Sequence, residues 1–398
     1  MSPLLETLSQ AAEEEERSSL TLKRCSRCVY HEETPGIFFD EEGVCHYCKI
    51  YDQMNLQYPA GQKGRSHLKA MADQIRRKGL RKKYDCIVGV SGGCDSSFML
   101  YQIKELGLRP LAVHFDNTWN SKISVENIHR ILKGLDVDLE TYVVDNEEYD
   151  DLSRSFLEAG VPDLDIPNDI GVAATLFRAA EKHGVRYIFD GHYFRTEGIS
   201  PLGWTYMDGK YIGSVQKKFG VRSFKTFPNM RMFSFLRWTV MNRIKRIRPL
   251  YHIDYEKEKT KELLNQKFNW QWYGGHHLEN RFTAFCQSYV LPVRFGIDKR
   301  ANGYSALVRS GQMGREEALT ALLQPPHLED GLVDFVKRRL LYSDEAFERL
   351  MSLPKRTYRD YKTYKPVFEK LRLFFWFLYR ADLVPKSFYI KYTSKSEG

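Results

Sequence analysis

The sequence lacks a hydrophobic run that is long enough to cross a membrane. The longest apolar cluster, residues 373–379 (LFFWFLY), is far shorter than the roughly 20 residues that a spanning helix needs. No charged-then-apolar signal segment opens the chain. We therefore expect a cytoplasmic protein. With 398 residues and 42% hydrophobic content, the chain is long enough for two or three domains with real cores.

Cysteine is scarce, and its spacing is not that of a disulfide-rich secreted scaffold. Four of the seven cysteines form two C-x-x-C pairs, which are separated by sixteen residues. This spacing is typical of two knuckles that close a tetrahedral zinc site. Because four thiolates leave no open coordination position, we predict a structural Zn²⁺, with free or redox-active cysteines as the alternative. The predicted ligands are Cys25, Cys28, Cys45 and Cys48.

Two familiar phosphate-binding motifs are missing. No G-x-x-x-x-G segment ends in Lys-Ser or Lys-Thr, and there is no G-x-G-x-x-G, so a Walker loop and a dinucleotide fingerprint are excluded. Residues 84–98 (YDCIVGVSGGCDSSF) instead run from a β-branched strand through a glycine- and serine-rich turn into a helix. Glycine lets backbone N–H groups approach an anion, and the helix N-terminus adds positive charge. We predict a phosphate loop here; an ordinary strand–turn–helix connection is the alternative.

From residue 84 to about 200, short strands alternate with helices. This pattern predicts an α/β fold with a parallel sheet, in which ligands bind outside the carboxyl ends of the strands. Three polar segments fall at such ends: 91–97, 114–117 and 190–192. The predicted strands are 84–90, 111–115, 139–144 and 186–190, and the predicted helices are 96–106, 122–134, 147–159 and 168–183.

Residues 91–96 (SGGCDS) resemble the S-G-G-x-D-S signature of the PP-loop ATP pyrophosphatases. In that superfamily the loop holds the phosphates of ATP, and a substrate oxygen is adenylated with release of pyrophosphate. The resemblance implies that the ATP ligands in the loop are Ser91, Gly92, Gly93, Asp95, Ser96 and Ser97. It also makes Asp116 and Asn117 candidate nucleoside ligands, and places Gly191 and His192 on the phosphate side. Each of these four residues is also common as a turn former or a structural residue.

After residue 200 the alternation of strands and helices ends, and further motifs appear. Glycines stand beside His, Glu, Arg and Lys at 272–283, 295–300 and 310–318, a composition typical of ligand-binding loops and of surface loops. Together with the paired C-x-x-C motifs, residues 91–97 and residues 191–198 (GHYFRTEG), the segments 273–277, 295–300 and 310–312 resemble the N-acetyl sugar amidotransferases of surface-polysaccharide biosynthesis. The resemblance covers roughly residues 22–398.

The resemblance implies an ATP-dependent, AMP-forming enzyme that converts a sugar acetamido group to an acetamidino group, with a nucleotide-activated sugar as its substrate. The loop would hold ATP, and Mg²⁺ would neutralise the phosphates. Lys299 or Arg300 would hold the pyrophosphate, and Asp95 would aid Mg²⁺ binding or brace the loop. His192 and Glu197 are candidates for orienting the acetamido group or the ammonia.

No glutaminase nucleophile can be placed in the chain. Met1 is followed by Ser2, and the cysteines outside the zinc motifs (Cys86, Cys94 and Cys286) lie in a strand, in the loop and in a helical stretch. A separate glutaminase partner is therefore expected, as the family uses. The net charge of +9 favours anionic partners. The alternative is a PP-loop tRNA-thiolating enzyme, but Cys86 and Cys94 match its usual catalytic cysteines poorly, so nucleic acid is not the expected partner.

We predict five parts of the chain. They are a mobile arm (1–21), a zinc module (22–60), a PP-loop ATP-binding domain (61–200), a substrate-binding region (201–330) and a helical C-terminal region (331–398). Within the last part, residues 361–379 predict a helix that either buries one face or lies on a membrane surface; burial is the favoured reading, and peripheral membrane association stays open.

Overall fold

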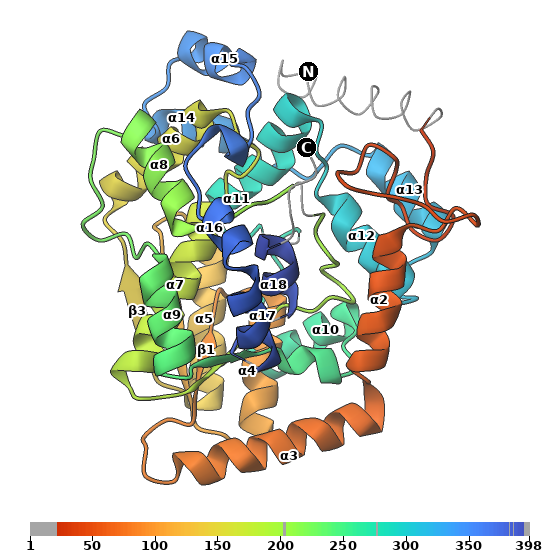
Figure 1. The fold of residues 1–398 in the computed structure, drawn as a ribbon, viewed down its shortest axis with the longest axis vertical. Coiled ribbons are helices and arrows are strands. Elements are labelled where there is room, and N and C mark those ends of the chain that lie inside the picture. The colour runs from red at the N-terminus through yellow and green to blue at the C-terminus, as the bar shows by residue number, and fades with distance from the viewer. Residues whose placement is uncertain (1–21, 202–203, 276–277, 382, 385, 394–398) are drawn as a thin grey trace.

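The computed structural model describes residues 22–201, 204–275, 278–381, 383–384 and 386–393 (Figure 1). The predicted arm at 1–21 and the pair His276–His277 lie outside these residues. The centre of the fold is a five-stranded sheet in the order β3-β2-β1-β4-β5, and every pair of neighbours is parallel. The predicted α/β class is confirmed. The strands are β1 (Cys86–Gly89), β2 (Pro110–Asp116), β3 (Leu139–Val143), β4 (Tyr187–Phe189) and β5 (Lys245–Ile247).

Both faces of the sheet are covered, which explains why its strands are apolar without alternation. Val88 and Ala112 face a core that includes α3, α4, α5 and α10. Ile87 and Val113 point the other way, into a core with α7. The helices are α2 (His46–Gln57), α3 (Gly61–Gly79), α4 (Cys94–Glu105), α5 (Lys122–Leu135), α6 (Asn146–Ala159), α7 (Ile166–Lys182), α8 (Gly209–Phe219), α9 (Met232–Leu236), η1 (Arg237–Met241), η2 (Pro249–His252), α10 (Lys257–Phe268), α11 (Arg281–Phe285), η3 (Cys286–Phe295), α12 (Arg300–Arg309), α13 (Arg315–Leu323), α14 (Leu332–Arg339), α15 (Asp344–Ser352), η4 (Tyr358–Asp360), α16 (Lys365–Lys370), α17 (Arg372–Arg380) and α18 (Lys386–Thr393).

The strand order changes direction at β1. The chain proceeds from β1 to β2 and β3 on one side, whereas β4 and β5 are added on the other side. This switch point opens a crevice at the carboxyl ends of β1 and β4. The loop after β1 and the segment after β4 meet there, because an added Cβ at Gly191 would lie 3.4 Å from the Cα of Ser96.

Three local differences from the sequence prediction stand out. The strand β5 was not predicted. Residues 36–44, whose sequence predicts a strand and a turn between the two cysteine pairs, form turns and a single bridge between Phe39 and Cys45. Residues 361–379 form two helices, α16 and α17, instead of one. The C-terminal helices share a large core with α6 and α8. Within the described residues, no helix is long and apolar enough to cross a membrane.

Candidate functional site

The loop between β1 and α4 is shaped by Gly92. Its φ of 78° is left-handed, and an added Cβ would lie 2.1 Å from the backbone oxygen of Ser124, so only glycine fits. The oxygen of Gly92 accepts hydrogen bonds from Trp270 Nε1 (3.0 Å) and Asn127 Nδ2 (3.3 Å). These bonds fix the turn from behind, and α4 begins directly after it, as an anion site at a helix N-terminus requires.

The loop opens into a cavity of about 990 Å³. Its walls come from the carboxyl ends of the strands, from α7 and α10, and from residues 272–275 and 299–304. Nine of the residues that the sequence singled out line this one cavity: Ser91, Gly93, Asp95, Ser96, Gly191, His192, Glu197, Lys299 and Arg300. Gly92 and Ser97 do not line it.

Asp116 and Asn117 also do not line the cavity, although they follow β2 as predicted. One oxygen of Asp116 accepts from the backbone of Thr118 and from Asn120 Nδ2. Asn117 is buried and bonds with Trp119, Asn168 and Asn280. In this structure both residues are turn formers, and their contact with a nucleoside stays a prediction.

Asp95 lies in a network that the sequence did not indicate. Its Oδ1 accepts a hydrogen bond from the buried Tyr255 hydroxyl, and its Oδ2 lies 3.7 Å from Lys257 Nζ. Lys257 and Lys261 are one turn apart on α10, and both line the cavity. Their i,i+4 spacing on a helix was the available signal, since it places two ammonium groups on one face.

A second charged group surrounds the end of β4. Asp190 Oδ2 accepts from Arg246 Nη2 at 2.5 Å, and Arg248 Nε lies 3.4 Å away. Burial alone would raise the pKa of Asp190, but these two arginines lower it below its usual range. His192 Nδ1 lies 2.9 Å from the Tyr251 hydroxyl, which accepts from Arg248. Arg246 and Arg248 come from β5 and the residue after it, the element that the sequence did not predict.

Glu197 is a partly buried carboxylate of the cavity. Its Oε1 accepts from the backbone of Tyr193 at 3.1 Å. Burial, followed by the nearby charge of Asp95, raises its pKa well above the usual range. The adjacent Thr196 hydroxyl also lines the cavity, is buried, and has no hydrogen-bond partner within the described residues.

The other end of the cavity is acidic. Asp163, Asp165 and Asp169 lie there, and Asp165 accepts from the Thr283 hydroxyl. The pKa of Asp169 is raised to about 7, mainly by burial and then by the charge of Asp165, while Lys299 opposes the shift. Asp169 is nevertheless accessible to water, because it faces the cavity and not the packed core. Lys299 therefore lies at this acidic end.

Arg300 is already engaged by its own element. It forms a two-pronged ion pair with Asp298, with a closest distance of 2.6 Å, and donates to the backbone oxygens of Ala321 and Leu322. These bonds join the start of α12 to the end of α13. A role of Arg300 in holding pyrophosphate stays a prediction, since its guanidinium has structural partners here.

The four paired cysteines form one buried cluster. The sulfur–sulfur distances are 3.8 Å (Cys25–Cys48), 3.7 Å (Cys28–Cys45) and 3.6 Å (Cys45–Cys48). Zn–S bonds of about 2.3 Å in a tetrahedron place sulfurs about 3.8 Å apart. The cluster therefore fits a tetrahedral metal ion, and Zn²⁺ remains the predicted one.

Two arginines attach this cluster to the C-terminal half of the chain. Arg309, buried at the end of α12, donates to the sulfurs of Cys28 (3.1 Å) and Cys48 (3.2 Å). Arg315, at the start of α13, donates to the backbone oxygens of Cys25 (3.0 Å) and Cys28 (3.3 Å). A tetrathiolate Zn²⁺ centre carries two negative charges, so a buried arginine beside it provides a counter-charge.

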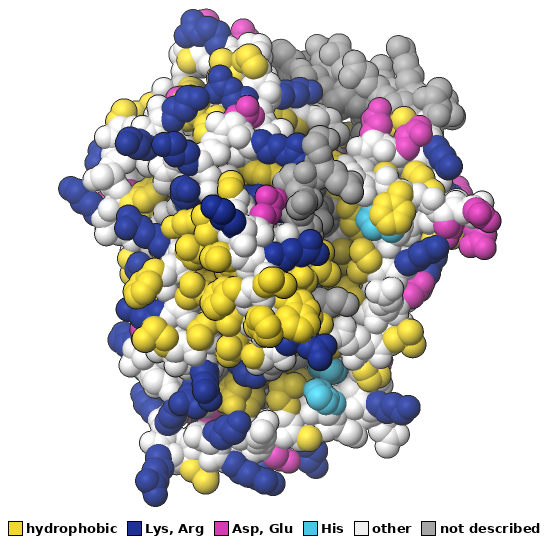
Figure 2. Space-filling model, in the orientation of Figure 1, with side chains coloured by type: hydrophobic (Ala, Val, Ile, Leu, Met, Phe, Trp, Pro, Cys, Tyr) yellow, Lys and Arg dark blue, Asp and Glu magenta, His cyan; other side chains and the backbone are white. Residues whose placement is uncertain are grey.

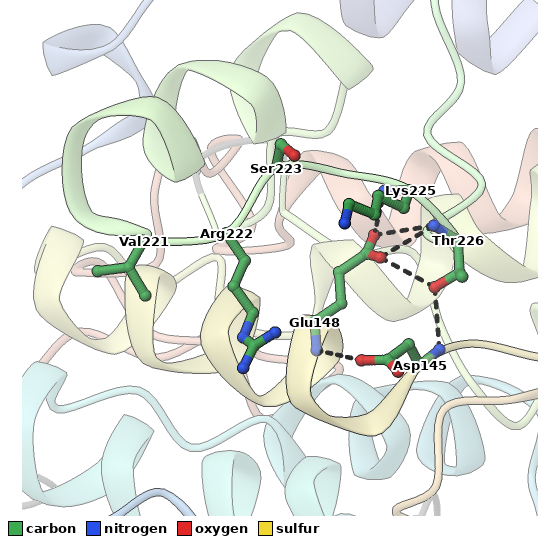
Figure 3. Close-up of a pocket in the computed structure, with 7 residues that line it drawn as sticks. All are labelled: Asp145, Glu148, Val221, Arg222, Ser223, Lys225 and Thr226. Atoms are coloured by element: carbon green, nitrogen blue, oxygen red, sulfur yellow. Dashed lines mark hydrogen bonds between the residues drawn. The ribbon is translucent and has the colours of Figure 1, made fainter.

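A smaller pocket of about 360 Å³ lies between α6 and residues 221–226 (Figure 3). Its carboxylate, Glu148, accepts from the backbone N–H groups of Lys225, Thr226 and Phe227. Asp145 caps α6 through Glu148 N. Both acids hold the loop in place, so this pocket is a poorer candidate for chemistry than the large cavity.

The C-terminal part of the chain matches a known family. Residues 279–373 match the model described as "LPS biosynthesis protein WbpG-like, C-terminal domain". The chain carries a WbpG-like C-terminal domain. This domain begins at Glu279, whose Oε1 accepts from the Ser91 hydroxyl of the phosphate loop at 3.2 Å. Lys299 and Arg300 also belong to the WbpG-like domain, so the cavity is shared between that domain and the loop.

Two curated relatives match shorter parts of the chain. An uncharacterized protein of Methanocaldococcus jannaschii is 28% identical over 172 residues, which are 42% of this chain and 58% of that protein. The tRNA-specific 2-thiouridylase MnmA of Proteus mirabilis is 32% identical over 128 residues, which are 28% of this chain and 35% of that enzyme. The matches thus span less than two thirds of either relative.

Solved structures of other proteins match a larger share of this chain than the curated relatives do, at low sequence identity. The NMN synthetase from Francisella tularensis is 9% identical with a TM-score of 0.33, over 74% of this chain and 98% of that chain. The U34-tRNA thiolase NcsA from Methanococcus maripaludis is 13% identical with a TM-score of 0.30, over 77% of this chain and 90% of that chain.

Proposed function

We propose that this protein is an ATP-dependent, AMP-forming amidotransferase that converts a sugar acetamido group into an acetamidino group. The observation that carries the proposal is the shared cavity: the phosphate loop forms one wall, and residues of the WbpG-like domain form the other. A volume of about 990 Å³ is large for a single small ligand and suits a nucleotide beside a sugar.

The chemistry requires that a poor leaving group be activated. The acetamido oxygen attacks the α-phosphorus of ATP, and pyrophosphate leaves. Ammonia then attacks the amide carbon and loses a proton, and AMP departs with the former amide oxygen. The N–H groups at the start of α4 and the hydroxyls of Ser91 and Ser96 would stabilise the negative charge that develops on the phosphates.

The pyrophosphate also needs a cationic site. Lys257 lies beside Asp95 at the loop, and Lys261 lines the cavity one turn further along α10, where it pairs with the exposed Glu258. Lys299 lies at the acidic end, and Arg300 is held by Asp298 and by two backbone oxygens. We therefore assign the pyrophosphate to the two α10 lysines. Oxygen ligands are those that Mg²⁺ prefers, so Oδ2 of Asp95 would hold Mg²⁺ together with the phosphates.

The region around Glu197 suits the acetamido group. Glu197 has a raised pKa, so its protonated form is favoured and can donate a hydrogen bond to an amide oxygen or imidate nitrogen. The Thr196 hydroxyl beside it is buried without a partner within the described residues. His192 lies on the phosphate side and would orient ammonia or a phosphate oxygen.

The test is a mass measurement on candidate substrates. The protein is incubated with ATP, Mg²⁺, an ammonium salt and a panel of nucleotide-linked N-acetyl sugars. The expected product is about one dalton lighter, because NH replaces O, and one AMP forms for each product. Ser96→Ala should lower turnover by about 100-fold, and Ser352→Ala, at the end of α15, is the matched control. ATP cleavage without any change in sugar mass would contradict the proposal.

tRNA thiolation is the second candidate, and the identity to a 2-thiouridylase favours it. Such chemistry needs an accessible thiolate. Burial raises the pKa of Cys94 to about 12, with Asp95 adding to the shift, and Cys94 is only 1% exposed. Cys86 is wholly buried. These two side chains argue for the sugar enzyme.

A further inference from the structure

The helix α17 leaves an apolar surface uncovered. Phe375 and Leu378 point into the core, but the neighbouring side chains face solvent, and Leu373 and Phe377 are 76% and 62% exposed. We call this set the α17 surface. It consists of Leu371, Leu373, Phe374, Trp376 and Phe377 of α17 and its start, with Ile390 of α18. Figure 2 shows hydrophobic side chains gathered over this region.

A second, distant segment lies beside it. Phe388 of α18 stacks on Phe235 of α9, with ring centroids 5.0 Å apart, and its ring lies 5.6 Å from that of Phe375. The α9 segment therefore packs against α18, which in turn packs against α17. In the sequence, residues 231–243 around α9 contain Arg231, Arg237 and Arg243 and no Asp or Glu.

The α17 surface itself has the same charge sign. Residues 370–381 contain Lys370, Arg372 and Arg380; of the acids that flank this range, Glu369 and Asp382, the first is paired with Lys365 at 3.2 Å. The Arg380 guanidinium lies 5.7 Å from the centre of the Trp376 ring, so an aromatic side chain and a cation share one edge. Figure 2 shows Lys and Arg side chains around the apolar patch. A partner that is complementary to the α17 surface would therefore be apolar in its middle and anionic around it.

We propose that the α17 surface binds the interface of a lipid bilayer that carries anionic headgroups. Trp, Phe and Leu on one helix face with flanking Lys and Arg are the composition of helices that lie in the membrane interface. Anionic lipids attract the basic border, and the apolar side chains enter the acyl boundary. A second copy of this chain is the poorer occupant, because its own cations would face these cations. The proposal does not depend on the reaction that the cavity performs.

Co-sedimentation of the full chain with vesicles tests this directly. Vesicles that contain phosphatidylglycerol should carry the protein down, and phosphatidylcholine vesicles should carry far less. High salt should weaken the binding, because it screens the basic border. The double variant Leu373→Ser/Phe377→Ser should lower partitioning about tenfold or more. The control Leu56→Ser/Leu341→Ser changes two equally exposed leucines elsewhere and should bind as the wild type does.

A charge-reversal variant separates the electrostatic contribution to vesicle binding from the apolar contribution. Arg372→Glu/Arg380→Glu should lower binding to phosphatidylglycerol vesicles, while Arg338→Glu on α14 should leave it nearly unchanged. All of these side chains are exposed, so circular dichroism should show an intact fold. Failure to bind phosphatidylglycerol vesicles, or binding that the apolar variant does not weaken, overturns the proposal. If the same apolar variant instead abolishes association with a glutaminase subunit or with a second copy, the surface is a protein interface and the lipid proposal is wrong.

Discussion

Two aspartates, Asp165 and Asp169, stand four residues apart at the start of α7 and face the same cavity. The pKa of Asp169 rises to about 7 chiefly because burial removes water from its carboxylate, and the nearby charge of Asp165 adds to the rise. The amidine that the proposed reaction forms is a cation, so an acidic end of the cavity suits the product better than it suits a phosphate.

This arrangement predicts how stability depends on pH. Asp169 has a pKa near 3.9 when unfolded and about 7 when folded, so between these values the folded state holds a proton that the unfolded state has released. The free energy of unfolding should therefore fall as pH rises from about 4 to about 7, and this loss should be complete above pH 7. Asp169→Asn removes the titration, so the variant should gain stability relative to the wild type across that window.

Urea denaturation midpoints at a series of pH values measure the difference. Asp330→Asn, an exposed aspartate outside the cavity, is the control and should follow the wild type at every pH. A constant difference between Asp169→Asn and the wild type from pH 4 to pH 7 would show that the raised pKa of Asp169 is wrong.

Individual site residues also show which positions can be predicted from the sequence and which cannot. The loop residues from Ser91 to Ser96 could be predicted, because their signature is local and each residue serves the same turn. Lys257 and Arg246 could not, since α10 and β5 reach the loop only through the fold. Asp116 follows a strand as a ligand would, yet its neighbours Thr118 and Asn120 use its carboxylate.

At the scale of elements, the four-cysteine cluster is held by two helices of the WbpG-like domain. Its core includes Ala301 of α12 and Ala318 of α13 beside the cysteines. Arg309 bonds to the sulfurs of Cys28 and Cys48, whereas Arg315 contacts the cluster through the backbone oxygens of Cys25 and Cys28. The two arginines therefore form a matched pair for separating metal binding from docking.

We expect Arg309→Met to weaken zinc binding about tenfold or more, because the thiolates lose N–H donors and a counter-charge. Arg315→Met should lower the melting temperature but leave zinc affinity close to that of the wild type. Metal content, zinc release to a chelator and thermal unfolding measure these effects. Equal zinc loss in the two variants would show that Arg309 does not act through the sulfurs.

The order of the elements was largely predictable, because strands buried on both faces alternate with amphipathic helices from β1 to β4. The strand β5 escaped prediction because Lys245–Ile247 is three residues long and two of them are charged. Its hydrogen bonds come from pairing with β4 alone. Residues 36–44 fold around the cysteines. Their hydrophobic side chains can therefore pack there without forming a hydrogen-bonded strand.

At the scale of the whole molecule, the chain folds back on itself around one cavity. The zinc module, the phosphate loop and the WbpG-like domain are far apart in sequence, yet α2 lies near α12 and α13 in Figure 1. The predicted domain boundaries stay a prediction, and the site belongs to no single part. In the proposed reaction, ammonia would therefore enter a cavity that several segments enclose.

The source of this ammonia gives the last prediction. A glutaminase needs an activated, accessible cysteine. Cys286 lies in η3 and is 1% exposed, and burial raises the pKa of its thiol well above the usual range. The histidines that a glutaminase based on Cys286 would use, His276 or His277, lie outside the described residues. The isolated protein should therefore use ammonium salts with ATP and fail with glutamine.

Activity with ammonium should rise with pH, because only NH₃ has the lone pair that attacks the adenylated carbon. Adding a glutaminase subunit should restore the use of glutamine without changing the rate with ammonium. Glutamate release and amidine formation are measured in the same reaction, with and without that subunit. If the purified chain alone hydrolyses glutamine and Cys286→Ser abolishes the hydrolysis, then this chain supplies its own ammonia and the separate partner is not needed.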